Sequence, residues 1–329
     1  MDEKIIVRKF IQDLNLKKVN LLKDYNSFYR TYFNDTKIIQ SKVENFVEKP
    51  GLSFSKDFVK QYKKLRSDIL EIFRFYVKGD VLRASTKMYN ILFRRKYYGK
   101  RFYEYFMKKM DNPKLYRCRK AKGGFEKEKI LNHIDEEMFH IPFDQRNVVG
   151  NARFSVSGFP CLYLGSSPEC CKIEIGMNDY NEIVCCSYES NEEFAYYDLT
   201  LSSKEISNFE DLKIYLLKSL IVQAVSYTIN PDIEVQLSCP RDKIKNFVTY
   251  YVIPQLITAS IASRGVKQKE TQCIRYHSVK FIEDYNQNNY VFIPRIKRYD
   301  SKHRYDENLR SKFDIKSYEQ VEEKELAHT

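Results

Sequence analysis

The 329-residue sequence contains no tryptophan and no apolar stretch of the length that a membrane span needs. The first residues, MDEKIIVRKFIQDLNLKK, contain neither an apolar run of signal-peptide length nor a small-residue cleavage pattern. These absences predict a soluble, cytoplasmic protein. Because tryptophan is missing, the aromatic part of the core must come from the 26 Tyr and 22 Phe, within a composition that is 43% hydrophobic.

Metal-ligand patterns are also missing. The eight cysteines all fall between Cys118 and Cys273, and none forms a C-x-x-C motif with a matching partner. This argues against a structural zinc site and predicts reduced thiols packed as small hydrophobic groups. His133, His140 and His277 form no recognisable metal or nucleophile set, so we expect structural roles for them and no bound metal.

The net charge of +12 is concentrated in the first third of the chain. Residues 1–110 carry 26 Lys and Arg against 12 Asp and Glu, a balance of +14, whereas the remainder carries 30 against 32. Residues 81–103, VLRASTKMYNILFRRKYYGKRFY, contain seven cations, several tyrosines and no acid. Three roles are open for such a surface. It can be a solvated face, it can bind an acidic protein partner, or it can bind nucleic acid. No helix-turn-helix spacing, RNP-like strand or zinc knuckle supports the nucleic-acid interpretation.

Apolar residues recur at spacings of three and four along residues 1–110, which predicts a helical domain. One such series is Phe58, Tyr62, Leu65, Leu70, Phe73 and Val77. The expected helices span about 2–14, 17–33, 37–47, 55–78, 81–93 and 97–110.

The sequence changes character at about residue 111. Strand-like runs (KLYRCR, CLYLG, EIVCCSY, FAYYDLT, IEVQL, IRYHSV and NYVFIP) alternate irregularly with helical stretches at 168–176, 208–229 and 247–262. This pattern predicts an α+β domain over residues 111–295. The polar residues 296–329 are expected to form a surface arm.

The segment RFSVSGFPCLYLGSSPECCKIEIG, residues 153–176, places a cation, an aromatic ring and an acid on neighbouring elements. Arg153 opens an alternating run, SGFP predicts a turn, and CLYLG predicts a strand carrying Tyr163. Ser167 followed by Pro168 is a helix-start signal. Glu174 then lies about two turns into the helix, where it has no capping role.

In R-F-S-x-x-G-x-P-x-L-Y-L-x-x-S-x-x-x-C-x-x-E, this segment resembles the core signature of RES-domain proteins. Further counterparts of the family pattern are Tyr116 and Arg117 in LYRCR and Ser278 in IRYHSVK, with His277 where proline is common. YNQNNYVFIP resembles the stretch that closes the domain, and MFHIPF (138–143) is similar to a segment of the longer members. We expect the two phenylalanines of MFHIPF to pack beneath the pocket.

The resemblance implies an ADP-ribosyltransferase-like fold and an activity that destroys NAD⁺, in a family where several members are toxins neutralised by an antitoxin. It implies that Glu174 stabilises the ribose cation formed as nicotinamide leaves, because a carboxylate can hold a developing oxocarbenium ion. Arg117 and Arg153 would bind the phosphates, Tyr163 would stack on the nicotinamide ring, and Ser278 would orient the ribose or the glutamate. No cofactor is implied, since NAD⁺ is the substrate.

Arg119, two residues beyond Arg117, projects to the same side of a strand and is a second, weaker candidate for the phosphates. Three interpretations of the function remain open. The favoured one is cleavage of the nicotinamide–ribose bond by water or phosphate, in a toxin-like or defence protein. The second is ADP-ribosyl transfer to a macromolecule, and the third is a nucleic-acid-binding protein whose RES-like part is inactive.

Overall fold

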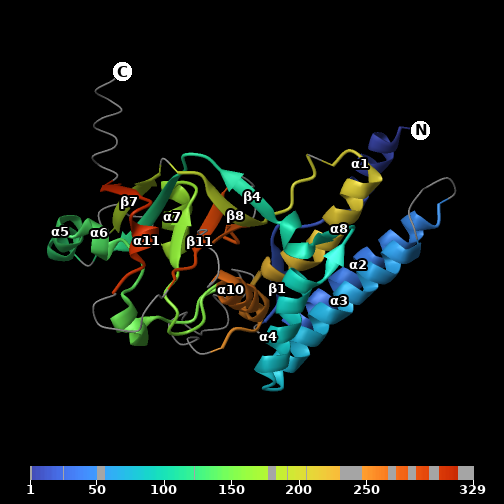
Figure 1. Ribbon diagram of the computed structural model, residues 1–329, viewed down its shortest axis with the longest axis horizontal. Helices are drawn as coiled ribbons and strands as arrows, with labels where there is room; N and C mark the ends of the chain where they lie inside the picture. Colours follow the sequence, from blue (N-terminus) through green and yellow to red (C-terminus); the bar gives the residue numbers. More distant parts are fainter. Residues whose placement is uncertain are drawn as a thin grey trace. The chain divides into compact units, whose positions relative to one another are not determined.

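In the computed structural model, the residues that can be described are 2–24, 26–49, 56–121, 123–176, 183–190, 192–204, 206–229, 247–265, 272–280, 287–295 and 304–317 (Figure 1). The chain divides into two compact units. Unit 1 comprises Met1–Phe106 and Leu199–Ser260, and unit 2 comprises Met107–Asp198 and Ile261–Thr329. The fold is mixed α+β, as the alternation of strand-like and helical runs predicts.

Unit 1 is built on long amphipathic helices. In helix α3 (Lys56–Val77), the side chains of Phe58, Tyr62 and Leu65 are fully buried, as the periodicity predicts. Val77, at the end of this helix, is 50% exposed. The unit contains α1 (Glu3–Leu14), β1 (Asn20–Leu22), α2 (Phe28–Val47), α3 (Lys56–Val77), α4 (Val81–Tyr89), the π-helical turn η1 (Asn90–Arg94), β2 (Lys96–Tyr97), β3 (Lys100–Arg101), the 3₁₀ turn η2 (Phe102–Tyr105), α8 (Phe209–Val225), β9 (Tyr227–Ile229), the 3₁₀ turn η6 (Thr249–Tyr251) and the first part of α10 (Val252–Gly265).

The expected all-helical composition of the first 110 residues is corrected at two places. Residues 17–33 contain strand β1, which pairs in parallel with β9 about two hundred residues later, and α2 then runs without a break. Residues 97–110 form the β2–β3 hairpin, η2 and strand β4 (Met107–Met110). The hairpin turn uses Tyr98 and Gly99, both with positive φ, a backbone conformation that a helix cannot contain.

Residues 199–260 belong to unit 1, although the sequence places them within the α+β domain. The middle of α8 is buried on nearly every face, because it packs among the helices of the N-terminal residues. The hydroxyl group of Tyr32 in α2 donates to the carbonyl of Leu220 in α8 at 3.0 Å. Helix α8 is therefore part of the core of unit 1.

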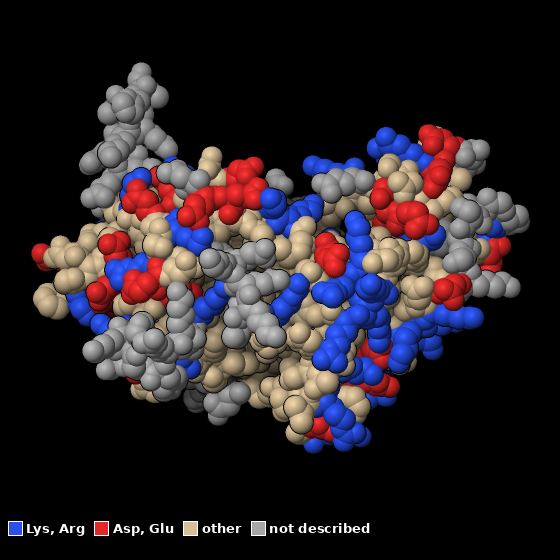
Figure 2. Space-filling view, viewed as in Figure 1, with Lys and Arg blue, Asp and Glu red and all other residues tan. Residues whose placement is uncertain are grey.

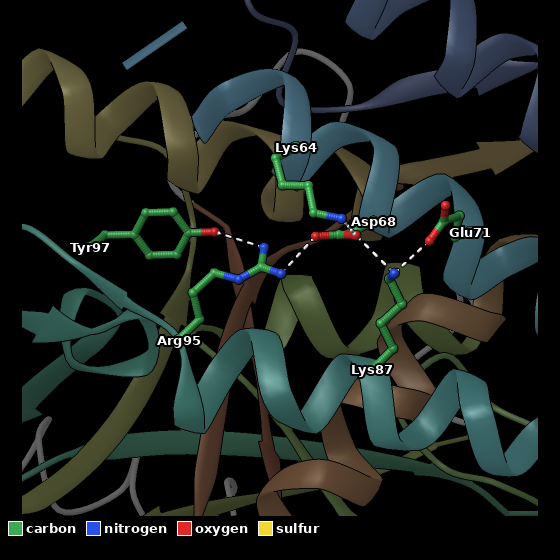
Figure 3. Close-up of polar contacts among 6 residues, drawn as sticks. All are labelled: Lys64, Asp68, Glu71, Lys87, Arg95 and Tyr97. Atoms are coloured by element: carbon green, nitrogen blue, oxygen red, sulfur yellow. Dashed lines mark hydrogen bonds and ion pairs between the residues drawn. The ribbon is translucent and has the colours of Figure 1, made fainter. Parts of the chain in front are cut away.

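One fully buried acid, Asp68, organises cations from α3, from α4 and from the residue that follows η1 (Figure 3). It pairs with Lys64 at 2.9 Å, Lys87 at 2.8 Å and Arg95 at 2.7 Å, and Lys87 also pairs with Glu71 at 2.5 Å. Burial raises the pKa of Asp68, but the hydrogen bonds from Lys87, Lys64 and Arg95 outweigh it, and the net pKa lies below the usual range. Two of the seven cations of residues 81–103 are thus committed inside unit 1.

Unit 2 is organised around an eight-stranded sheet in the order β12-β7-β5-β6-β11-β10-β8-β4. Its strands are β4, β5 (Lys114–Lys120), β6 (Leu162–Gly165), β7 (Ile183–Glu189), β8 (Phe194–Leu199), β10 (Cys273–His277), β11 (Asn288–Phe292) and β12 (Asp314–Ser317). Its helical segments are α5 (Gly124–Asn132), α6 (Ile134–Glu137), η3 (Phe143–Val148), α7 (Pro168–Ile175) and α11 (Glu307–Arg310). The predicted strands that fall on described residues are all present, and IEVQL lies outside those residues.

The two faces of this sheet are distinguished by their register. Residues directly opposite in antiparallel strands share a face, so Tyr116, Gly165 and Asn289 lie on one face, together with Tyr276. Helix α7 covers this face. The opposite face carries the main core, formed by Leu115, Leu162, Leu164, Val184, Cys186, Tyr188, Phe194, Tyr196, Cys273, Tyr290 and Phe292 with residues from outside the sheet.

The expected polar arm after residue 296 is wrong for residues 304–317. Tyr305, Leu309 and Phe313 belong to the main core, and β12 pairs with β7 as an added strand of the sheet. The buried ring of His140 holds this segment, since its Nε2 accepts a hydrogen bond from the amide of Asp306 at 3.1 Å. None of the helices that the structure describes has the length and apolar composition to cross a bilayer.

Candidate active site around Glu174

Helix α7 begins where the sequence predicts. The Ser167 side chain caps it by accepting from the amide of Cys170 at 3.1 Å, and Pro168 occupies the first turn. Gly176 ends the helix in the left-handed conformation. Glu174 therefore lies in the last turn, where a carboxylate opposes the helix dipole. Such a position needs partners from elsewhere in the fold.

Two strands supply those partners. Ser278, after β10, donates from Oγ to Glu174 Oε1 at 2.5 Å, and Asn289 in β11 donates from Nδ2 to the same oxygen at 2.7 Å. Ser278 is 2% exposed and Asn289 5% exposed, whereas Glu174 is half-buried. Lys280 donates to the carbonyl of Ile173 at 3.0 Å and to that of Glu174, so it places a cation at the carbonyl end of α7. The acid is thus held by charge-assisted hydrogen bonds at one oxygen.

Helix α7 lies unusually close to β6. A Cβ atom added at Gly165 would lie 2.6 Å from the Sγ of Cys171. The Cys171 thiol in turn donates to the carbonyl of Tyr116 at 3.1 Å. At the start of the helix, Gln287 Oε1 accepts from the hydroxyl groups of Ser166 and Ser167 at 3.1 and 2.9 Å. These contacts fix both the depth and the direction of the helix that carries Glu174.

Arg153 lies in a tight turn that is closed by an isolated bridge between Ala152 and Ser155. The expectation that Arg153 opens a strand is therefore corrected. The side chain of Arg153 is 7% exposed. The Tyr163 hydroxyl accepts from the amide of Phe154 at 3.2 Å and bonds to the Ser155 hydroxyl at 2.8 Å. Tyr163 therefore braces the turn that carries Arg153.

The same turn is attached to β10 by a contact between two tilted aromatic rings. The centroids of Phe154 and Tyr276 are 4.7 Å apart, and Tyr276 lies two residues before Ser278 on the same face. The structure thus brings Arg153, Tyr163, Glu174 and Ser278 to elements of one sheet face. Tyr163 lies in β6 as expected, and its hydroxyl group is bonded to the backbone amide of Phe154 and to the side chain of Ser155.

Arg117 does not join this group. In β5 it is opposite Cys186, whose side chain belongs to the main core, so Arg117 lies on the face away from α7. Its Nη1 donates to the carbonyl of Met138 at 2.9 Å and to that of Phe139. Arg119 lies on the same far face and bonds to the carboxylate of Glu137 at 2.5 Å. Both arginines are engaged in holding the segment that follows α5.

The cysteines around α7 are buried thiols. Burial raises the pKa of Cys170, with further contributions from Cys171 and Glu174, and burial also raises the pKa of Cys161. A protonated thiol is a poor nucleophile, which argues against a nucleophilic role for Cys161 and Cys170. The seven cysteines that the structure describes are free thiols. Across the described part of the chain, no group of His, Cys, Asp or Glu is arranged to hold a metal.

Sequence reasoning missed three residues that contact Glu174 or hold the start of α7, namely Asn289, Lys280 and Gln287. YNQNNYVFIP marks the end of the domain, but nothing in it shows which of its polar side chains faces Glu174. The register decides this, because Asn289 is opposite Gly165 and therefore beneath α7.

A basic surface belongs to unit 1, whereas the site around Glu174 belongs to unit 2. Figure 2 shows Lys and Arg side chains gathered over the part of the view where Figure 1 draws α3. On the β2–β3 hairpin, Lys96 is directly opposite Arg101, and both are exposed together with Lys100 and the nearby Arg94. Within the described part of the chain, none of these four cations has an acidic partner in ion-pair distance.

The chain is similar to a protein of Bacillus subtilis (strain 168) that carries the name "Putative toxin YopC". The two are 30% identical over 177 residues, which make up 51% of this chain and 39% of the relative. This chain thus spans well under half of the length of that protein. No protein-family profile and no solved structure matches the chain. The resemblance to RES-domain proteins stays a prediction.

Proposed function

We propose that unit 2 is an NAD⁺-consuming enzyme that cleaves the nicotinamide–ribose bond. The observation that carries this proposal is the arrangement of Glu174, a half-buried carboxylate held at one oxygen by Ser278 and Asn289 at 2.5 and 2.7 Å. Because Asn289 lies in β11 and Ser278 directly follows β10, neighbouring strands position both donors and orient the carboxylate before substrate arrives. Pre-oriented groups of this kind stabilise charge that develops in a transition state.

The proposed chemistry follows from the groups on this face. As nicotinamide leaves, positive charge forms on the ribose, and the carboxylate of Glu174 stabilises it. The planar guanidinium group of Arg153 binds the phosphates, and the turn braced by Tyr163 sets its position. Arg117 is not part of this proposal because its guanidinium group holds carbonyl groups on the far face. Water or phosphate then takes the ribosyl group.

A toxin-like role fits this activity, since loss of NAD⁺ harms a cell, and the similar protein of Bacillus subtilis carries the name "Putative toxin YopC". Such an enzyme would act in the cytoplasm, where its substrate is found. ADP-ribosyl transfer to a macromolecule uses the same first step and differs only in the acceptor. Product analysis therefore separates the two activities.

The test is incubation of the purified full-length chain with NAD⁺, with products identified by mass. Glu174→Gln should lower kcat by about a hundredfold or more, the effect of losing one transition-state stabiliser. Glu169→Gln is the matched control, because Glu169 is an exposed acid on the same helix. Free ADP-ribose or its phosphate supports cleavage, whereas a mass increase on a macromolecule supports transfer. Equal turnover by the folded Glu174→Gln variant and the parent would refute the assignment.

We also propose that the β2–β3 hairpin docks an acidic protein partner, such as an antitoxin. Like charges directly opposite in a hairpin destabilise it, and Lys96 faces Arg101 in this way. A carboxylate-rich surface would relieve that repulsion. Three cations of residues 81–103 are already paired with Asp68 or Asp80, so the exposed remainder is confined to this hairpin and Arg94.

Reversal of three hairpin charges tests the docking proposal, with poly-glutamate and a DNA duplex as probes in separate titrations. The Lys96→Glu, Lys100→Glu and Arg101→Glu chain should lose salt-dependent binding of poly-glutamate. The control is an equal reversal on helix α1, at exposed positions Lys4, Arg8 and Lys9. Binding of the duplex alone would favour the nucleic-acid interpretation, and equal losses in both variants would remove the hairpin from the proposal.

A further inference from the structure

We infer that Asn289 is a positioning residue for Glu174, which makes Glu174 Oε2 the oxygen that faces the substrate. This inference rests on the proposed function. Asn289 is 5% exposed, and its amide nitrogen donates to Glu174 Oε1 at 2.7 Å. No residue of the sequence signature predicts this contact.

The orientation of the Asn289 amide is set by its second contact. The thiol of Cys170, on α7, is 3.5 Å from Asn289 Oδ1 and 3.7 Å from the carbonyl oxygen of Asn288, so the shorter contact is to the side chain. Since a thiol donates and a carbonyl oxygen accepts, this contact places the NH₂ group toward Glu174. One asparagine therefore joins α7 at two points, at Cys170 in its first turn and at Glu174 in its last.

Both donors act on the same carboxylate oxygen. Ser278 Oγ lies 2.5 Å from Oε1, and Asn289 Nδ2 lies 2.7 Å from it. Oε1 is therefore occupied as an acceptor, and the part of the chain that the structure describes places no hydrogen-bond donor on Oε2. A carboxylate held at one oxygen cannot rotate freely, so Oε2 has a defined direction for interaction with the ribose.

The two donors have different capacities. The Ser278 hydroxyl can donate or accept, so it adapts to a rotated or protonated carboxyl group. The Asn289 NH₂ group can only donate. Asn289 therefore specifies the orientation of the carboxylate more strictly than Ser278 does.

The experiment compares two nearly isosteric variants of the full chain, assayed for NAD⁺ consumption. Asn289→Leu removes the donor, and Asn289→Asp replaces it by an acceptor that repels Glu174. We expect kcat to fall about tenfold to a hundredfold in Asn289→Leu and further in Asn289→Asp, with KM for NAD⁺ changed less than about threefold. The control is Asn20→Leu, which removes a buried amide that donates to Ser226 in unit 1 and should leave kcat unchanged.

Double variants separate positioning from a general loss of structure. In a Glu174→Gln background, Asn289→Leu should lower kcat no further, because the group that it positions is already lost. A merely structural role would give a further loss equal to that in the parent. A parent-like kcat in folded Asn289→Leu, or additive losses, would overturn the inference.

A readout independent of activity distinguishes this inference from the proposed function. Urea unfolding of Asn289→Leu, Glu174→Gln and the double variant should show coupling between the two sites, whereas Asn20→Leu should be additive with Glu174→Gln. If the parent consumes no NAD⁺ but the coupling is present, the proposed function fails and the positioning contact stands. If the coupling is absent, the inference fails whatever the activity.

Discussion

The buried His140 should make the stability of this protein fall steeply in mildly acidic solution. Its Nδ1 is 2.8 Å from the carbonyl of Ile141, and its Nε2 accepts from the amide of Asp306 at 3.1 Å. This pair of contacts requires a neutral ring with its proton on Nδ1. A second proton on Nε2 would place two donors against each other.

The size of the effect follows from the pKa. Burial lowers the pKa of His140 to about 4, despite opposing contributions from the carbonyl of Ile141 and from Asp306. In the unfolded chain the ordinary value is about 6.5. The unfolded state therefore takes up a proton that the folded state refuses, and stability falls as the pH drops from 6.5 towards 4. The loss is about 2 kcal/mol between pH 7.5 and 5, and about 3 kcal/mol by pH 4.

Urea unfolding followed by circular dichroism at pH 7.5 and pH 5 measures this loss. His140→Gln keeps a donor and an acceptor but cannot titrate, so it should lose about 2 kcal/mol less than the parent over the same interval. His133→Gln is the control, because His133 is exposed and its replacement should leave the pH dependence of the parent unchanged. Parallel pH dependence of the parent and His140→Gln would refute the reasoning.

Three further changes test the fold around the site and the core of unit 1. Gly165→Ala places a Cβ atom 2.6 Å from the thiol of Cys171, so urea unfolding should show a loss of about 1–3 kcal/mol that Cys171→Ala largely restores; no rescue would contradict the close approach of α7. Arg153→Lys should weaken NAD⁺ binding measured by calorimetry, because lysine lacks the planar fork of arginine. Arg117→Lys should lower the free energy of unfolding and leave NAD⁺ binding unchanged. Weaker NAD⁺ binding by Arg117→Lys alone would place Arg117 at the substrate. Asp68→Asn leaves three cations without their common carboxylate and should lower the free energy of unfolding by about 3 kcal/mol. An unchanged midpoint of urea unfolding would disprove this.

Local chemistry made much of the site predictable. The Ser167-Pro168 pair specifies the start of α7, because a side-chain acceptor and a ring without an amide suit the first turn of a helix. The apolar run before it specifies β6, and the spacing then places Glu174 in the last turn of α7. These are signals between neighbours in the chain, and the structure confirms them.

Arg117 shows what such local signals do not predict, namely which face of the sheet a side chain occupies. Alternation predicts that Arg117 and Arg119 share a face of β5, which they do, but it does not say which face. The pairing of Arg117 with Cys186 decides this, because Cys186 points into the main core. The side that α7 covers follows from the same pairing of distant strands.

Composition gave wrong predictions for residues 304–317 and 97–110 for a related reason. Residues 304–317 are mostly polar in composition. Nevertheless, the side chains of Tyr305 and Phe313 are buried in the main core, and β12 extends the sheet. Residues 97–110 are rich in aromatic rings, and dense rings suit either a helix or short strands. The positive φ angles of Tyr98 and Gly99 resolve the choice in favour of a hairpin.

The sequence by itself determined the mixed α+β class, the local elements around Glu174 and the concentration of basic charge in the first third. Only the tertiary structure decided that residues 199–260 join the N-terminal helices, and that Ser278 and Asn289 meet at one oxygen of Glu174. The physical reason is that helix caps, turns and periodicity act over a few residues. The register of strands far apart in the chain depends on which buried surfaces fit together, and no short segment contains that information.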